Sequence, residues 1–292
     1  MIKEFTIHLP SGRILEVSEG GDSKGLPIFA LHGTPGSRLL NPQHLAYAES
    51  HYIRLIGYNR PGYGGSTPLP GRRIVDVASD VAAIADSLEL DKFAVWGHSG
   101  GGPPALACAA ALSRRVVAAS SLAALAPYNA EGLDWFAGMG EFNVEDFKLM
   151  LSNESQWELK CRKDTDMMLK ATRAEFDQMF TTILSQVDKN FISDELLGFF
   201  QDQLKEAFKT GIRGECDDAL AMCRPWGFDP ASIQVPVQIW HGRQDKFVPV
   251  THGEWLASHI PHAEAHLEKN EGHSSLGMRR IPDVQSWLAA KF

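Results

Sequence analysis

The sequence predicts an α/β protein with a mostly parallel sheet, helices on both faces of the sheet and an inserted helical cap. Three observations predict this fold. Short apolar stretches alternate with amphipathic helical ones, which is typical of a parallel sheet covered on both faces. One apolar stretch turns abruptly into a helix at Ser99. The composition then changes over about 100 residues before the alternation resumes.

The predicted strands are short and apolar, and Gly, Pro or polar turn residues bound them. They are expected at residues 4–9, 13–18, 26–31, 53–56, 93–97, 116–125, 235–240 and 264–268. Apolar residues recur at helical spacing over residues 73–88, and a closing helix is predicted over residues 284–290. This order of strands and helices requires most of the strands to run in the same direction.

The composition changes between about residues 128 and 228. This segment lacks β-branched alternation and is rich in Phe, Met, Trp, Asp, Glu and Lys, which favours several amphipathic helices. We therefore divide the chain into a first core part (1–127), a helical cap (128–228) and a second core part (229–292). Helix starts are predicted at Asn143 and Ser193, each followed by acidic residues. The aromatic and Met side chains are expected mainly in the core of the cap, with a minority facing a substrate.

Composition and charge narrow the classes of function. The 292 residues are 44% hydrophobic and 22% charged, as is ordinary for a globular protein, and the net charge is −8. No basic stripe offsets that charge, so neither nucleic acid nor a membrane surface is an expected partner. The first residues alternate like a strand rather than a signal peptide, and no apolar stretch is long enough to cross a bilayer. We expect a cytoplasmic protein that acts on a small molecule; its oligomeric state is left open.

The four cysteines form neither a C-x-x-C motif nor the Cys/His spacing of a metal site. In a reducing compartment such residues are expected to be free thiols. They are Cys108, Cys161, Cys216 and Cys223.

The turn at Ser99 has the pattern of a nucleophile elbow. Its sequence Gly97-His98-Ser99-Gly100-Gly101 fits G-x-S-x-G, in which glycines allow the strand and the helix to approach while the serine projects its hydroxyl. The same pattern occurs around Ser23, but there it lies in a polar cluster typical of a turn. Because only Ser99 has a predicted strand before it and a helix after it, we predict Ser99 as a nucleophile.

A serine nucleophile needs a base, and the base needs a carboxylate that fixes its tautomer. Of the 11 histidines, His273 lies in a Gly/Ser turn after the last predicted strand. That position is the carboxyl edge of the sheet, where Ser99 also lies. Asp245 follows the preceding strand and is the expected acid, and Glu131 is the second choice. The order Ser99, Asp245, His273 is typical of α/β enzymes with this elbow.

The remaining strand-end residues have predicted supporting roles. Because His98 adjoins the nucleophile, it is expected to point elsewhere, whereas His32 and His241 are expected to brace loops. Residues 32–38 form a Gly/Pro-rich loop with unpaired backbone N–H groups. We predict that the backbone N–H groups of Thr34 and Gly100 bind the developing oxyanion.

Taken together, five motifs resemble the α/β-hydrolase superfamily and specifically its capped serine hydrolases, such as esterases and proline iminopeptidases. The resemblance covers the chain from about residue 4 to its end and implies an eight-stranded, mostly parallel sheet, a lid between two core halves and a serine mechanism without cofactor or metal. The motifs are His32-Gly-Thr-Pro-Gly, Asn59-Arg-Pro-Gly-Tyr-Gly-Gly-Ser, Gly97-His-Ser-Gly-Gly, His241-Gly-Arg-Gln-Asp245 and Gly272-His273.

Three positions refine the resemblance. Asn59 stands where relatives usually have Asp, which we expect to affect loop packing rather than catalysis. Thr34 replaces the second glycine of the His-Gly-Gly-Pro-Gly motif of proline iminopeptidases, which weakens a peptidase assignment. Ser99 stands where epoxide hydrolases and haloalkane dehalogenases carry Asp, which argues against both activities.

These features predict an esterase-like serine hydrolase that forms an acyl-enzyme on Ser99. An aminopeptidase of the proline iminopeptidase type, with acidic cap residues around the substrate's amino terminus, is the main alternative. A carbon–carbon or cyanohydrin lyase could use the same three residues, and a ligand-binding protein could keep the fold without turnover. The sequence does not identify the acyl group or the leaving group.

Overall fold

The chain folds around an eight-stranded sheet in this computed structural model, which describes residues 2–292. The strand order is β1-β2-β4-β3-β5-β6-β7-β8; β2 is antiparallel to its two neighbours and every other pair is parallel. The eight-stranded, mostly parallel sheet predicted from the sequence is therefore confirmed. The strands are β1 (Lys3–His8), β2 (Ile14–Gly21), β3 (Leu26–Leu31), β4 (Ile53–Tyr58), β5 (Phe93–His98), β6 (Val116–Leu122), β7 (Val237–Gly242) and β8 (Glu264–Glu268).

Two strand boundaries differ from the prediction for local reasons. β6 ends at Leu122 rather than near residue 125, because the next residue, Ala123, has a φ of +47° and leaves the extended conformation. β7 begins at Val237 rather than at residue 235, because Pro236 has no N–H group to donate to a neighbouring strand. Both differences lie at strand ends and leave the topology unchanged.

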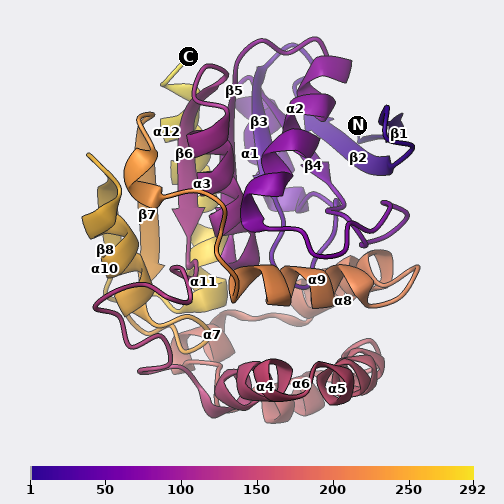
Figure 1. Ribbon diagram of the computed structural model, residues 1–292, viewed down its shortest axis with the longest axis vertical. Coiled ribbons are helices and arrows are strands. Elements are labelled where there is room, and N and C mark those ends of the chain that lie inside the picture. Colours follow the sequence, from indigo (N-terminus) through magenta and orange to yellow (C-terminus); the bar gives the residue numbers. More distant parts are fainter. Residues whose placement is uncertain (1) are drawn as a thin grey trace.

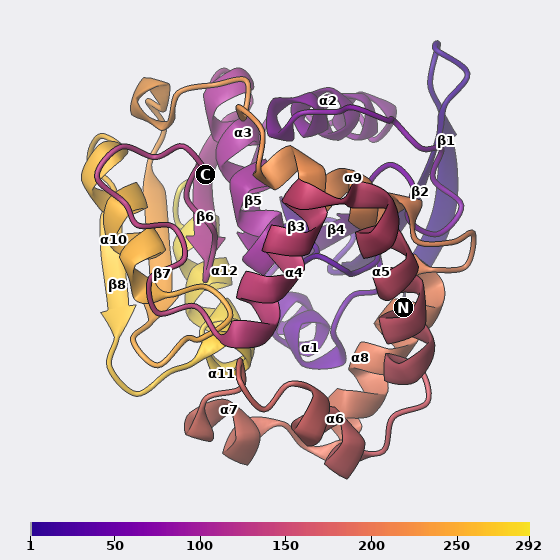
Figure 2. The same cartoon turned by 60° about the horizontal axis from the view of Figure 1, so that its bottom comes forward.

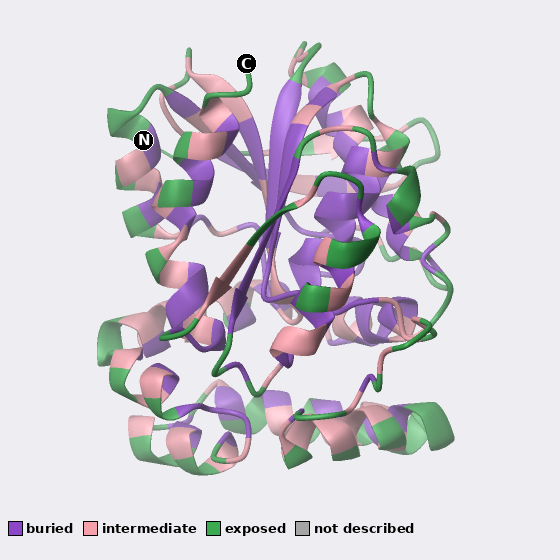
Figure 3. Ribbon diagram, turned by 90° about the vertical axis from the view of Figure 1, so that its left-hand side faces the viewer, coloured by how far each residue is buried: buried purple, intermediate pink, exposed green. Residues whose placement is uncertain are grey.

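Helices cover both faces of the sheet, as Figures 1 and 3 show. Successive side chains of a strand alternate between the faces, so Ile28 belongs to one buried cluster and Phe29 to the other. The Phe29 face is covered by α2 (Val77–Ser87), α3 (Gly102–Ala111) and α10 (Val250–His259), and the Ile28 face by α1 (Pro42–Ser50) and α12 (Ile281–Ala289).

Six helices, here called the inserted helices, lie between β6 and β7. Figures 1 and 2 show them gathered at the carboxyl end of the sheet. Ser193 is the N-cap of one of them, as predicted, and its Oγ accepts the N–H of Leu196 at 3.1 Å. Asn143 is not a helix start, because that helix begins two residues earlier. The inserted helices are α4 (Glu141–Ser152), α5 (Glu154–Met168), α6 (Arg173–Met179), α7 (Gln186–Phe191), α8 (Asp194–Ala207) and α9 (Arg213–Met222). The cap boundaries at residues 128 and 228 stay a prediction.

Two further sequence features can be compared with the fold. Cys108, Cys161, Cys216 and Cys223 are all free thiols, as expected. Within residues 2–292, no helix has both the length and the apolar character that crossing a bilayer requires.

Candidate active site

Ser99 occupies the sharp turn between β5 and α3. It is the first residue of a short 3₁₀ helix, η2 (Ser99–Gly101), and has a φ of +54°, a conformation that side-chain-bearing residues rarely adopt. A Cβ atom at Gly97 would overlap the carbonyl of Gly101, and one at Gly101 would overlap the carbonyl of Leu31. The glycines are therefore required by close backbone contacts, as the elbow pattern predicted.

His273 and Asp245 are hydrogen-bonded to each other. The His273 Nδ1 atom donates to Asp245 Oδ2 at 2.7 Å, which leaves Nε2 free of the carboxylate. Asp245 is itself held by the backbone N–H groups of Phe247 and Val248, at 2.8 and 2.9 Å from Oδ1. His273 is not in a turn, as the sequence suggested, but is the first residue of the short helix α11 (His273–Arg279). The Phe247 ring stacks on its imidazole at a centroid distance of 4.6 Å.

In this buried pair, each side chain shifts the pKa of the other. Burial by itself would lower the pKa of His273, but the contact with Asp245, together with the nearby charge of Asp188, raises that pKa above its ordinary value. Burial would likewise raise the pKa of Asp245, but His273 and His241 hold it below its usual range. The arrangement therefore favours an ionised aspartate and an imidazole that is more basic than an ordinary histidine.

The predicted oxyanion groups, Thr34 and Gly100, lie side by side. A Cβ atom at Gly100 would overlap the Thr34 side chain, so the Gly100 backbone approaches that side chain closely. The Gly100 N–H is in the first turn of η2, where no acceptor within the helix is available. The Thr34 N–H donates no hydrogen bond within the described part of the chain. Both groups are therefore free to bind a ligand oxygen.

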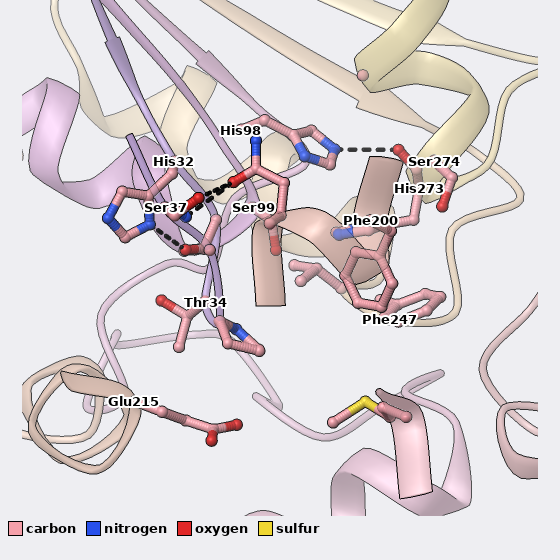
Figure 4. A pocket seen from close by; sticks show the side chains of 18 of the residues that line it. His32, Thr34, Ser37, His98, Ser99, Phe200, Glu215, Phe247, His273 and Ser274 are labelled. Atoms are coloured by element: carbon pink, nitrogen blue, oxygen red, sulfur yellow. Dashed lines mark hydrogen bonds between the residues drawn. The ribbon is translucent and has the colours of Figure 1, made fainter. Parts of the chain in front are cut away.

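Ser99, His273, Thr34 and Gly100 all line a cavity of about 450 Å³ between the sheet edge and the inserted helices. Figure 4 shows some of the side chains that line it. Most of the wall is apolar, which suits a ligand with a hydrocarbon part. The structure thus identifies the apolar residues that face the cavity, which the sequence could not separate from the core. They include Phe142, Phe147, Trp157, Met168, Phe176, Phe180, Phe199, Phe200 and Met222.

One wall of the cavity is acidic. The carboxyl group of Glu215, on α9, points into the cavity on the side away from His273 (Figure 4). Burial, followed by the nearby charges of Asp146 and Asp164, raises its pKa to about 8. Lys160 pairs with Asp146 at 2.8 Å and with Asp164 at 2.6 Å. Among residues 2–292, however, the buried Glu215 Oε2 has no hydrogen-bond partner.

His98 does not point away from the site, as the sequence suggested. Its Nε2 donates to the backbone carbonyl of His273 at 3.0 Å, and the two ring centroids are 4.8 Å apart. Burial lowers the pKa of His98 to about 3, so its ring is neutral. The side chain therefore supports the start of α11. Adjacent residues of a strand point to opposite sides, but Ser99 has already left the strand, so alternation does not separate them.

The other two histidines brace loops, as predicted. His32 Nε2 accepts the backbone N–H of Arg60 at 3.2 Å, and His241 Nε2 donates to the carbonyl of Val248 at 2.8 Å. Burial lowers the pKa of both rings. The second choice of acid, Glu131, is exposed and absent from the cavity wall, so its position does not suit that role.

A buried ionic cluster lies behind the oxyanion loop. Asp218, on α9, binds Arg60 at 2.5 Å and Arg72 at 2.7 Å, and it accepts the Thr34 hydroxyl at 3.0 Å. The Arg60 guanidinium also donates to the carbonyl of Gly33 at 2.9 Å. Burial alone would raise the pKa of Asp218, but the two arginines lower it well below its ordinary value. An inserted helix thus fixes the loop that carries Thr34.

Asn59 is fully buried and makes contacts that an aspartate could not make. Its amide nitrogen donates to Glu16 at 2.8 Å and to Glu206 at 3.1 Å, while its oxygen accepts the N–H of Arg38 at 2.7 Å. A carboxylate here would face two other carboxylates. The departure from the family pattern therefore concerns loop packing, as expected.

Three site residues were missed by the sequence analysis. Glu215, Asp218 and the buried Asp188 all come from the inserted helices, where acidic residues are frequent and mostly solvated. Nothing in their spacing distinguishes them from the acidic residues on exposed helix faces. Only their burial against the core marks them.

Comparison with known proteins gives a family. Residues 27–277 match the family model described as alpha/beta hydrolase fold. The AB hydrolase superfamily protein YisY of Bacillus subtilis (strain 168) is 25% identical over 258 residues, which cover 86% of each chain. A probable proline iminopeptidase of Leptolyngbya boryana is 25% identical over 285 residues, covering 88% of this chain and 84% of that protein.

A solved structure shows the same fold. The crystal structure of the esterase RhEst1 from Rhodococcus sp. ECU1013 matches with a TM-score of 0.67 and 20% identity, covering all of this chain (100%) and 99% of the esterase. The family match spans most of the sequence, including the elbow, the Asp245 loop and His273. The chain therefore belongs to the family of hydrolases with the alpha/beta hydrolase fold.

Proposed function

We propose that this protein is a serine hydrolase that cleaves small ester substrates through Ser99, His273 and Asp245. In this proposal Ser99 is the nucleophile, His273 the base and Asp245 the group that orients the imidazole. The backbone N–H groups of Thr34 and Gly100 bind the oxyanion. The proposed partner is a small-molecule substrate.

One observation carries the proposal: the 2.7 Å bond between Asp245 and His273 lies at a cavity that Ser99 also lines. A histidine whose Nδ1 donates to a buried carboxylate presents its Nε2 as a base, which is how a serine hydroxyl is activated. The unpaired N–H groups of Thr34 and Gly100 supply the stabilisation that a tetrahedral oxyanion needs.

The proposed reaction has two steps. The Ser99 Oγ attacks the ester carbonyl carbon while its proton passes to His273 Nε2, and the resulting oxyanion lies between Thr34 and Gly100. His273 then returns the proton to the leaving alcohol as the acyl-enzyme forms. Water, deprotonated by the same imidazole, attacks the acyl carbon and restores the Ser99 hydroxyl with release of the acid.

The cavity favours a compact substrate with apolar groups. Its volume of about 450 Å³ lies in the range of small-molecule sites, and most of its side chains are aromatic or aliphatic. Nitrophenyl esters with short or medium acyl chains are therefore suitable first substrates.

Covalent labelling tests the nucleophile. A fluorophosphonate probe is expected to label the wild type and not Ser99→Ala, because the probe reacts with an activated serine hydroxyl. Hydrolysis of nitrophenyl butyrate is expected to fall by roughly three orders of magnitude or more in the same variant.

The matched control is Ser23→Ala, which removes the exposed serine of the second G-x-S-x-G match. This variant should be labelled by the probe, and should hydrolyse nitrophenyl butyrate, like the wild type. Persistent labelling of Ser99→Ala would disprove the nucleophile assignment.

A second candidate function is supported by Glu215. An unpaired carboxyl near two other carboxylates would suit a substrate with a protonated amino group, as in the aminopeptidase alternative. The similarity to a probable proline iminopeptidase agrees with this alternative. On the ester hypothesis, the same group would instead face a polar atom of a neutral substrate.

Two substrates separate these candidates. If the substrate carries an ammonium group, Glu215→Gln should lower kcat/KM for proline naphthylamide by roughly ten- to a hundredfold and change nitrophenyl butyrate hydrolysis little. The exposed Glu195→Gln on α8 is the matched control. Failure of the wild type to cleave proline naphthylamide, with rapid ester hydrolysis, would reject the aminopeptidase candidate.

A further inference from the structure

Asp188, on α7, is a buried aspartate that contacts the segment carrying His273. Its Oδ2 atom accepts the backbone N–H of His273 at 3.0 Å, and its Oδ1 accepts that of Ser275, also at 3.0 Å. The Ser185 hydroxyl donates to Oδ2 at 2.7 Å. The side chain is fully buried. A single carboxylate of an inserted helix therefore binds the first turn of α11.

Gly272, the residue before His273, allows Asp188 to approach. A Cβ atom at Gly272 would overlap both the Asp188 carboxylate and the Ser185 hydroxyl, so a residue with a side chain there would push α7 away. The Gly272 N–H is turned inward and donates to Ser275 Oγ at 2.9 Å. The glycine before His273, which the sequence analysis used only as part of a motif, is explained by the approach of Asp188.

The protonation states of the groups around the His273 imidazole determine how much the Asp188 charge contributes there. The ring contacts Asp245 from the loop after β7, His98 from β5 and the Phe247 ring, and His241 from β7 lies 3.6 Å from the Asp245 carboxylate. Burial keeps both neighbouring histidines neutral, by lowering their pKa values. Asp245 and Asp188 therefore supply the negative charge near the ring.

Other charges near α11 are paired among themselves. Glu271 binds Arg279 at 3.3 Å and Arg280 at 3.6 Å, and Arg279 lies over the Phe191 ring of α7. The Asp188 carboxylate, in contrast, accepts its hydrogen bonds from uncharged donors: two backbone N–H groups and one hydroxyl. Since these dipoles neutralise a charge only in part, the negative charge remains effective at His273.

We propose that Asp188 is a positioning residue for His273, an inference that rests on the proposed hydrolase function. It fixes the first turn of α11 so that the imidazole meets Asp245, and its charge favours the imidazolium that forms when Ser99 is deprotonated. Because Asp188 belongs to an inserted helix, a base in working position depends on the docking of α7 against α11.

The test compares Asp188→Asn with the wild type and with Asp166→Asn, a control on an exposed position of α5. With nitrophenyl butyrate, Asp188→Asn should lower kcat by roughly tenfold with little change in KM, because the base is misplaced. The wild-type kcat/KM should rise with pH along an acid limb whose apparent pKa lies above 6.5, since the raised pKa of His273 keeps the ring protonated to higher pH.

In Asp188→Asn this acid limb should move to lower pH by roughly 0.5 to 1. Loss of a neighbouring negative charge lowers the pKa of the imidazole, and a purely structural role would not produce that shift. Asp166→Asn should leave both readouts unchanged. A lower melting temperature with the wild-type kcat and acid limb would overturn the proposal.

Ser185→Ala tests the proposal if Asp188→Asn does not fold. It removes one of the three donors that partly neutralise the Asp188 charge, so the pKa of His273 should rise and the acid limb should move to higher pH by a smaller amount; no shift in a folded variant would overturn the proposal. An NMR titration of the His273 imidazole in both variants needs no turnover. It separates this inference from the proposed function, which fails when Ser99 is not labelled.

Discussion

Asp188 and Asp218 both join the inserted helices to the core, but their surroundings differ. Asp218 lies behind the loop that carries Thr34, and it is matched by the guanidinium groups of Arg60 and Arg72. Asp188 lies behind the helix that carries His273, and its donors are backbone N–H groups and a hydroxyl. One carboxylate is balanced by charge, whereas the other is balanced only by dipoles.

Because of this difference, we expect Asp218 to contribute mainly to the stability of the fold and Asp188 mainly to the reactivity of His273. Removing a charge from a balanced buried cluster leaves uncompensated cations in the interior, which destabilises the fold. Removing a charge that dipoles alone solvate has a smaller effect on folding but changes the field at the neighbouring imidazole. Two buried aspartates with similar locations are therefore expected to give different mutant phenotypes.

The largest effect on stability is expected for Asp218→Asn. The change leaves Arg60 buried without a balancing carboxylate and leaves Arg72 with only its longer contact to Asp217 at 3.3 Å, so the free energy of unfolding should fall by about 3 kcal/mol. Urea denaturation at pH 7 measures this fall. The acid limb of the pH–rate profile should stay in its wild-type position, because Asp218 is not among the charges that face His273.

The control for this prediction is Asp202→Asn on α8, whose ion pair with Lys205 at 2.9 Å is exposed. Exposed pairs contribute little, so the change in unfolding free energy should be below about 1 kcal/mol. A shift of the acid limb in Asp218→Asn as large as that in Asp188→Asn would remove the distinction between the two aspartates.

A smaller loss of stability is expected for Thr34→Val, which changes the same cluster on the side of the loop that carries Thr34. The hydroxyl donates to Asp218 at 3.0 Å and accepts from Arg60 at 3.1 Å, whereas the backbone N–H proposed for the oxyanion is retained. Loss of these bonds should reduce the free energy of unfolding by about 1 kcal/mol, as measured by urea denaturation. A loss as large as that of Asp218→Asn would mean that Thr34, rather than the charge balance, holds the cluster together.

Local patterns predicted the parts of the site that depend on local backbone geometry. The strand before Ser99 and the glycines around it predicted the elbow, because close strand–helix contact tolerates no side chain at Gly97 or Gly101. The strand ends likewise placed Asp245 and His273 at one edge of the sheet. The pattern did not reveal that His273 begins a helix, since α11 is short and its first turn is held by Asp188.

The sequence by itself determined the fold, the order of strands and helices and the candidate nucleophile, base and acid, because these follow from periodicity and turn chemistry along short stretches. Only the tertiary structure decided which residues of the inserted helices face the cavity and which bind the core. Asp188, Glu215 and Asp218 resemble ordinary surface acids in the sequence. Asp188 and Asp218 bind segments 85 and 184 residues away in the chain, and no local pattern encodes such long-range contacts.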